Sequence, residues 1–395
     1  MKVSLWGLFL THTYLLHNNI EATELAGGQI ITRTNVEPIA DHAKDIRDMH
    51  HICFTSDESN AARDIYHNGK NTHHSLSSLS LKSEYQKGWT FEFQKYGLLR
   101  GDLSPESLEE WEEEEEGMQW FAHDFVMTEL DKEECVLATN AALVLNVWMM
   151  AAYELWEGWD ECRRLSDESY FVDFDPNQKA DDFIAYWVGS LQDDMAHMGG
   201  HSLFSLTNEA GQYFNTIDRN GVAFANLAIV AAYEEASAIL SKSDACSQDD
   251  GEGRTIQELW KVYHVIASEM LVPMMQHLLK GMLEQDPETV RLYATIVVPQ
   301  TSQCRTSTFE LLKARLLDRS YHKKDFVEVY QALISTFDCL GIRCDDIGVP
   351  NGYSVPICYD SSLVLAEYPA DSQVRQVRGL GGRLLTLICC VLFSL

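Results

Sequence analysis

The densest group of side chains able to ligate a metal lies around a pair of glycines at 199–200. It contains Asp193, His197 and His201, which are spaced four residues apart. On a continuous helix these side chains would share one face, and two such histidines beside a carboxylate suit a first-row transition metal. The glycines are expected to end the helix before His201, however, and the glutamate of the metalloprotease motif HExxH is absent. A polar helix end with an exposed histidine is therefore the competing interpretation.

A second group combines tyrosine with glutamate. It comprises Tyr186, Glu209 and Tyr213. Phenolate and carboxylate oxygens are hard ligands, and such ligands suit ferric iron. Each tyrosine taken singly is more typical of a core aromatic residue whose hydroxyl group is hydrogen-bonded.

Motifs for nucleophilic or nucleotide-dependent catalysis are absent. The chain contains no GxSxG, no P-loop and no Rossmann glycine pattern, and no paired cysteine and histidine that would indicate a nucleophile and its base. The sequence therefore favours a binding protein over an enzyme.

The chain is strongly acidic. Sixty aspartates and glutamates against thirty lysines and arginines give a formal net charge of −30. Such a field repels nucleic acid and anionic membranes and concentrates cations near the surface. The glutamate-rich run at 109–116 is typical of a solvated segment rather than a ligand cage. We therefore expect a cation as partner and no nucleic acid, and the sequence identifies no protein partner.

The N-terminal residues have the pattern of a secretory signal peptide. Lys2 precedes an apolar run at 3–16, and Ala22 is a suitable last residue before cleavage. We expect residues 1–22 to be removed and the mature protein to be secreted.

The C-terminal residues carry the pattern of a lipid-anchor signal. The apolar stretch at 384–395 is too short to span a bilayer, which takes about 20 residues. A polar spacer and the small residues 370–372 precede it. This order is typical of a glycosylphosphatidylinositol (GPI) anchor signal, here residues 373–395. We expect the protein at the cell surface or in the periplasmic space, attached to a membrane through the lipid.

The cysteine count predicts disulfides. Eight cysteines remain between the two expected signals, and their spacing matches no zinc site. The connectivity is open from sequence. Proximity and helix-end positions favour three pairs: Cys339–Cys344, Cys135–Cys162 and Cys246–Cys304.

Helical periodicity dominates the mature chain, and almost no segment alternates with period two. We therefore predict an all-α, two-lobed ectodomain with halves 23–172 and 173–350, followed by a tail at 351–372. The apolar stretch 135–162 is predicted to be a buried core helix. Helices of the second half are predicted at 178–196, 202–214, 221–242, 255–285, 287–298, 304–318 and 323–338.

Several strings resemble segments of secreted algal proteins. They are DIYHNGKN at 64–71, LNVWM at 145–149, AYWVGS at 185–190, FNT at 214–216 and DCLGIRCDDIG at 338–348. The second half, around AYWVGS and FNT, is similar to the low-iron-inducible periplasmic proteins, whose relatives include the phytotransferrins. The resemblance covers about residues 60–350, in order. The resemblance implies a cell-surface protein that captures ferric iron with carbonate as co-ligand. Tyr186 lies inside a matching string, and Glu209 and Tyr213 lie near it. Arg219 or Arg254 would supply the cation that a carbonate needs.

Two other functions remain open from sequence. The first is a structural or adhesive surface protein whose carboxylates are merely solvated. The second is a secreted metal-dependent hydrolase centred on Asp193, His197 and His201.

Overall fold

The computed structural model describes residues 22–55, 59–72, 74–81, 121–165, 176–242, 245–246 and 254–352. The expected signal peptide, the glutamate-rich run, most of the tail and the anchor signal lie outside the described residues. Nearly all regular structure in the described residues is helical, which confirms the predicted all-α class. The exceptions are a short antiparallel hairpin, β1 (Glu24–Leu25) with β2 (Ile30–Ile31), and one isolated bridge.

The helices of the first half lead into one long apolar segment. They are α1 (Glu37–Ala40), α2 (His42–Thr55), α3 (Ser59–Asn68), α4 (Leu76–Leu81), α7 (Phe121–Asp131), α8 (Cys135–Ala141), the π-helical η2 (Ala142–Val147) and α9 (Trp148–Leu165).

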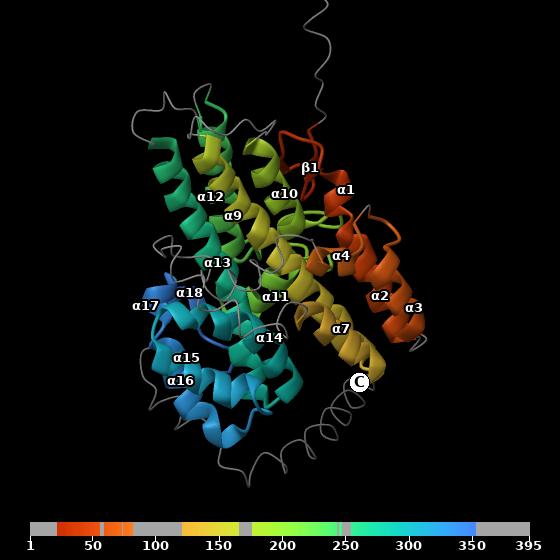
Figure 1. Cartoon of the computed structure of the whole chain (residues 1–395), viewed down its shortest axis with the longest axis vertical. Helices are drawn as coiled ribbons and strands as arrows, with labels where there is room; N and C mark the ends of the chain where they lie inside the picture. Colours follow the sequence, from red (N-terminus) through yellow and green to blue (C-terminus); the bar gives the residue numbers. More distant parts are fainter. Residues whose placement is uncertain are drawn as a thin grey trace, which may run out of the picture.

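The helices of the second half begin with five longer ones and end with short ones. They are α10 (Pro176–Val188), α11 (Leu203–Phe214), α12 (Phe224–Leu240), α13 (Arg254–Glu284), α14 (Pro287–Gln300), η3 (Thr301–Gln303), α15 (Thr306–Leu312), η4 (Lys313–Leu317), η5 (Lys323–Asp325), α16 (Phe326–Ile334), α17 (Phe337–Leu340) and α18 (Cys344–Ile347). In Figure 1, α9, α10, α12 and α13 lie side by side, with α2, α3 and α7 on one flank and α14 to α18 on the other.

The segment Cys135–Leu165 forms one continuous helical rod through α8, η2 and α9. It is long and apolar enough to cross a membrane, yet 83% of its most apolar window is buried inside the protein. Asn146 is fully buried within it, and its side-chain amide donates hydrogen bonds to the Tyr66 hydroxyl group and the Leu76 carbonyl group. Burial of most of the segment, with the Asn146 N–H groups bonded to protein partners, is typical of a core helix, so the predicted core helix is confirmed.

The helix predicted over 178–196 is wrong at its C-terminal end. α10 stops at Val188, because Gly189 has a positive φ of 69°. A Cβ atom at this position would lie 2.8 Å from the Ala43 Cβ and 3.2 Å from the Ser202 Cβ. This close approach of α2 and α11 requires a glycine, and the left-handed backbone there ends the helix.

All three expected cysteine pairings are wrong. The disulfides are Cys53–Cys135, Cys162–Cys246 and Cys304–Cys339, and Cys344 is also disulfide-bonded. Cys135 and Cys162 cannot meet because they lie near opposite ends of one rod, roughly 40 Å apart at 1.5 Å per residue. Proximity in sequence was a poor guide since each bond joins separate helical segments.

A buried carboxylate attaches the N-terminal hairpin to the helices. Asp181 of α10 is fully buried and accepts hydrogen bonds from the backbone N–H groups of Arg33 and Thr34 at 2.8 and 2.7 Å. It also accepts hydrogen bonds from the Thr34 and Tyr233 hydroxyl groups at 2.8 and 2.6 Å. These four donors satisfy the buried charge and join the hairpin connection, α10 and α12.

We predict that Asp181→Ala lowers the free energy of unfolding by about 3 kcal/mol, because it leaves several buried donors without an acceptor. Urea denaturation would measure the change. Asp193→Ala is the matched control, since the Asp193 side chain is 83% exposed. Equal effects of the two substitutions would contradict the anchoring role.

Candidate functional site

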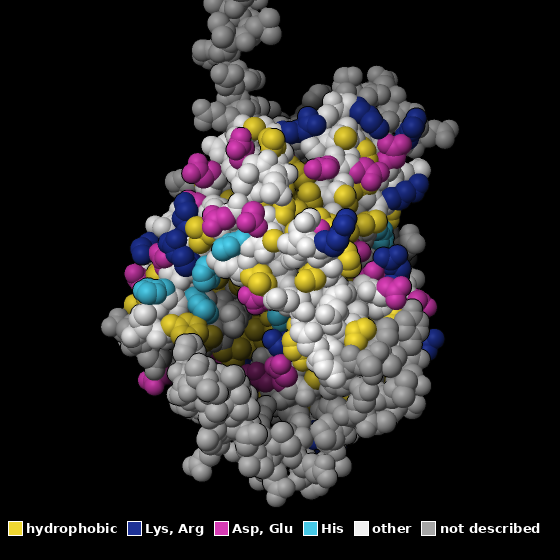
Figure 2. Space-filling view, turned by 180° about the vertical axis from the view of Figure 1, so that it is seen from behind, with side chains coloured by type: hydrophobic (Ala, Val, Ile, Leu, Met, Phe, Trp, Pro, Cys, Tyr) yellow, Lys and Arg dark blue, Asp and Glu magenta, His cyan; other side chains and the backbone are white. Residues whose placement is uncertain are grey.

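A cleft of about 450 Å³ opens between α2, α8, η2, α11, α13 and α14. Figure 2 shows it as a hollow with histidine side chains (cyan) at one edge and acidic side chains (magenta) at another. One part of its lining is apolar and consists of Ile46, Leu137, Leu143, Val144, Leu206 and Leu292. Leu143 and Val144 belong to the π-helical η2, a distortion that is frequent at functional sites.

Two histidines face the cleft from one wall. His50 comes from α2 and His201 from the residues just before α11, and their ring centroids are 5.6 Å apart. Burial lowers the pKa of His50. Burial, followed by the nearby His50, lowers the pKa of His201. Both rings are therefore neutral at pH 7, and a neutral imidazole is the form that binds a metal.

Side-chain hydrogen bonds hold the segment that carries His201. The Gln192 amide donates to the carbonyl groups of Asp194 and His197 at 2.8 and 2.6 Å. The Asn208 amide of α11 donates to the Met195 carbonyl group at 2.9 Å. His201 itself has a φ of 49°, which is the left-handed region that non-glycine residues rarely occupy.

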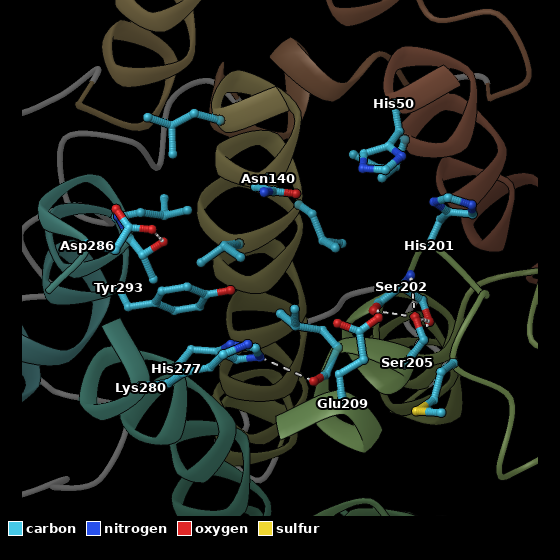
Figure 3. A pocket seen from close by; sticks show the side chains of 18 of the residues that line it. His50, Asn140, His201, Ser202, Ser205, Glu209, His277, Lys280, Asp286 and Tyr293 are labelled. Atoms are coloured by element: carbon cyan, nitrogen blue, oxygen red, sulfur yellow. Dashed lines mark hydrogen bonds between the residues drawn. The ribbon is translucent and has the colours of Figure 1, made fainter. Parts of the chain in front are cut away.

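Glu209 lies on the floor of the cleft. It projects from α11 toward the space between the two walls (Figure 3). Its side chain is exposed to the cleft, but the walls exclude part of the surrounding water, and this desolvation raises its pKa against a smaller opposing effect of Lys280. It forms no hydrogen bond or ion pair with the described residues. A carboxylate in this position is free to bind a ligand.

The opposite wall carries His277 and Lys280 of α13 and Tyr293 of α14 (Figure 3). The His277 ring stacks on Tyr293 with centroids 4.7 Å apart, and its Nε2 lies 3.3 Å from the Leu206 carbonyl oxygen. Burial lowers the pKa of His277 to about 4, so the neutral ring donates through Nε2. The Lys280 ammonium group lies 5.1 Å from the Tyr213 ring centroid and forms no ion pair with a described residue.

The structure brings two of the six predicted metal ligands into this cleft, His201 and Glu209. Tyr213 follows Glu209 by one turn of α11, outside the lining, beneath Lys280. Tyr186 is 2% exposed in the core, with its ring 5.8 Å from that of His42. Burial, then Glu154 and Asp182, raise the pKa of Tyr186 well above its ordinary value, which disfavours a phenolate there.

The remaining predicted ligands lie on the loop that follows α10. The Nε2 atom of His197 is 4.0 Å from a carboxylate oxygen of Asp193. Since α10 ends at Val188, these residues and His201 do not share a helix face. Among the described residues, no three histidine, cysteine, aspartate or glutamate side chains are grouped closely enough to hold a metal ion by themselves.

The two arginines expected beside an anion lie elsewhere. Arg219 is exposed in the turn before α12, and Arg254 at the start of α13 forms an ion pair with Glu258. The cation in the cleft is Lys280, which sequence reasoning missed. Its signal was its position one helical turn after His277, which places both on one face of a predicted helix.

His50 was also missed, because the pair His50–His51 is typical of a solvent-exposed surface. Of the two, only His51 is exposed. His50 lies one turn after Ile46, and both line the cleft. The helical spacing from a core residue was the signal that distinguishes the two histidines.

We predict that His201→Gly leaves the protein as stable as the wild type or more stable by about 1 kcal/mol, because glycine occupies the left-handed region without strain. His201→Val should destabilise it, since a β-branched residue is unfavourable there. Thermal and urea unfolding of both variants would test this. Equal losses in the two variants would show that the imidazole, rather than the backbone, determines stability at this position.

The candidate site is assigned from the geometry of its side chains alone. Comparisons with protein-family models, with curated proteins and with solved structures found no match to this chain.

Proposed function

We propose that this protein is a cell-surface binding protein that captures a metal cation in the cleft, with ferric iron as the expected ion. The observation that carries the proposal is the pair of neutral imidazoles, His50 and His201, facing the same cleft as the carboxylate of Glu209. Imidazole and carboxylate together are a common ligand set for iron and other first-row metals.

The charge of the protein supports a cationic ligand. The net charge of −30 attracts cations over the whole surface, and Glu209, Glu284 and Asp286 line the cleft. Because both imidazoles are already deprotonated at pH 7, binding there requires no loss of a proton from them. The two imidazoles of His50 and His201 leave coordination positions for a co-ligand such as carbonate.

The two alternatives have less support. A hydrolase centred on Asp193, His197 and His201 would need these three side chains in one site, and among them only His201 lines the cleft. A structural or adhesive protein needs no cleft with unpaired polar groups. If the cleft binds no ligand, a structural or adhesive function is expected.

The proposed location follows from the ends of the sequence. Disulfides are compatible with an extracellular protein. The signal peptide and the lipid anchor are proposed from sequence, because their residues lie outside the described part. Release of the protein from cells by a phosphatidylinositol-specific phospholipase would test the anchor.

We predict that the secreted protein binds ferric iron stoichiometrically and that His50→Ala weakens this binding about 10–100-fold or more, the scale expected when a metal site loses a supporting group. Equilibrium dialysis against iron buffered by nitrilotriacetate, with and without bicarbonate, would measure it. His51→Ala is the matched control, since the neighbouring His51 is exposed outside the cleft lining.

Three outcomes would contradict iron binding at this site. Equal binding by the His50→Ala and His51→Ala variants would remove the cleft from consideration. A visible tyrosinate-to-iron band that disappears in Tyr186→Phe or Tyr213→Phe would move the site to those tyrosines. Absence of iron binding in every variant and in the wild type would favour the structural or adhesive function.

We predict that the affinity for iron decreases at acidic pH. The pKa values of His50 and His201 lie below the ordinary value of about 6.5. Affinity should therefore be nearly constant from pH 7 to 8 and fall as pH decreases below about 6, because protonation removes the lone pair that binds the metal. The same dialysis at several pH values would check this. A steep change between pH 7 and 8 would indicate other ligands.

A further inference from the structure

The cleft is much larger than a single metal ion needs. Its volume of about 450 Å³ lies in the range of about 300–1,000 Å³ that is typical of sites for small organic molecules. A site for a bare ion instead surrounds the ion closely with protein ligands. Here no group of three histidine, cysteine, aspartate or glutamate side chains suited to a metal occurs among the described residues. The space and the shortage of protein ligands both indicate that the ligand brings further atoms of its own.

The two walls of the cleft offer different chemistry. One carries the imidazoles of His50 and His201 (Figure 3). The other carries the ammonium group of Lys280, with the acidic Glu284 and Asp286 further along the same wall. Lys280 forms no ion pair with a described residue, and its ammonium group lies over the Tyr213 ring. The surface of the cleft also includes the aliphatic side chains of Leu143 and Val144. A ligand that contacts the imidazoles, the ammonium group and the aliphatic side chains together has a metal at one end, an anionic group at the other and a carbon skeleton between them.

We infer that the cleft takes its metal as a complex with a small organic polycarboxylate of about the size of citrate, with the metal at His50 and His201 and a free carboxylate at Lys280. This inference rests on the proposed metal-binding function and specifies the form of the ligand. Carboxylate oxygens of the chelator fill the coordination positions that the protein leaves open. The outer carboxylate gains a charge-assisted hydrogen bond from Lys280 in a partly desolvated site.

Glu209 favours a ligand that carries a metal cation over the free chelator. Its carboxyl group on the floor of the cleft would repel a free polycarboxylate, whereas a bound metal cation compensates that repulsion. The metal complex should therefore bind better than the chelator alone. A chelator that occupies every coordination position of the metal should also bind poorly, because it leaves no position for the imidazoles.

The test uses ferric citrate as the probe and isothermal titration calorimetry of the secreted protein. Ferric citrate should bind stoichiometrically, whereas citrate alone and ferric EDTA should bind at least about tenfold more weakly, a difference of 1.4 kcal/mol. Lys280→Met should weaken ferric citrate binding at least about tenfold, and Lys280→Arg should restore much of it. Lys261→Met is the matched control, because Lys261 is an exposed lysine of the same helix outside the cleft lining.

The outcomes separate this inference from the proposed function. Iron with bicarbonate that binds as tightly as ferric citrate, depends on His50 and ignores Lys280→Met would overturn the inference and leave the function standing. Citrate alone binding as tightly as its iron complex would overturn both, because the cleft would then be an anion site. Absence of binding by every form of iron would likewise overturn both.

Discussion

Burial of the apolar rod from Cys135 to Leu165 is the constraint on which the rest of the structure depends. A stretch this apolar is stable in water only if other helices cover it, and α10 and α13 pack along α9 while α2, α4 and α7 pack against α8 and η2. The same coverage creates the cleft, because the N-terminal part of the rod supplies its apolar lining, including Leu143 and Val144. The helices that bury the rod also carry the polar groups: α2 supplies His50 and α13 supplies Lys280.

The fold class and the buried rod could be predicted from sequence because both depend on periodicity and composition, which are local properties. The end of α10 could not, since Gly189 is required by the approach of Ala43, which is far away in the chain. Only part of the candidate site could be predicted, for a related reason. His201 and Glu209 were recognised by residue type, but only the packed structure shows that His50 and Lys280 face them across one cleft. The type of a residue shows which chemistry its side chain can perform, whereas only the tertiary structure shows which side chains meet in one site.

Two of the strings singled out in the sequence, DIYHNGKN and AYWVGS, have clear structural roles in this chain. In the first, Gly69 has a φ of 67°, and the turn that follows places the Asn71 N–H and side-chain amide on the buried carboxylate of Asp45 at 2.9 and 2.7 Å. In AYWVGS, the Trp187 indole N–H donates to the Asn226 side chain at 2.9 Å. Packing and hydrogen bonding within this chain therefore explain these residues without a bound ligand.

The disulfides have a consequence for how the protein reaches its native state. Numbered along the chain, the first cysteine is bonded to the second, the third to the fourth and the fifth to the sixth. No later cysteine has to displace an earlier partner. An oxidant that meets the chain from its N-terminal end would therefore join native partners simply by taking thiols in the order in which they emerge. The slow reshuffling that interleaved disulfides require is unnecessary for these three bonds.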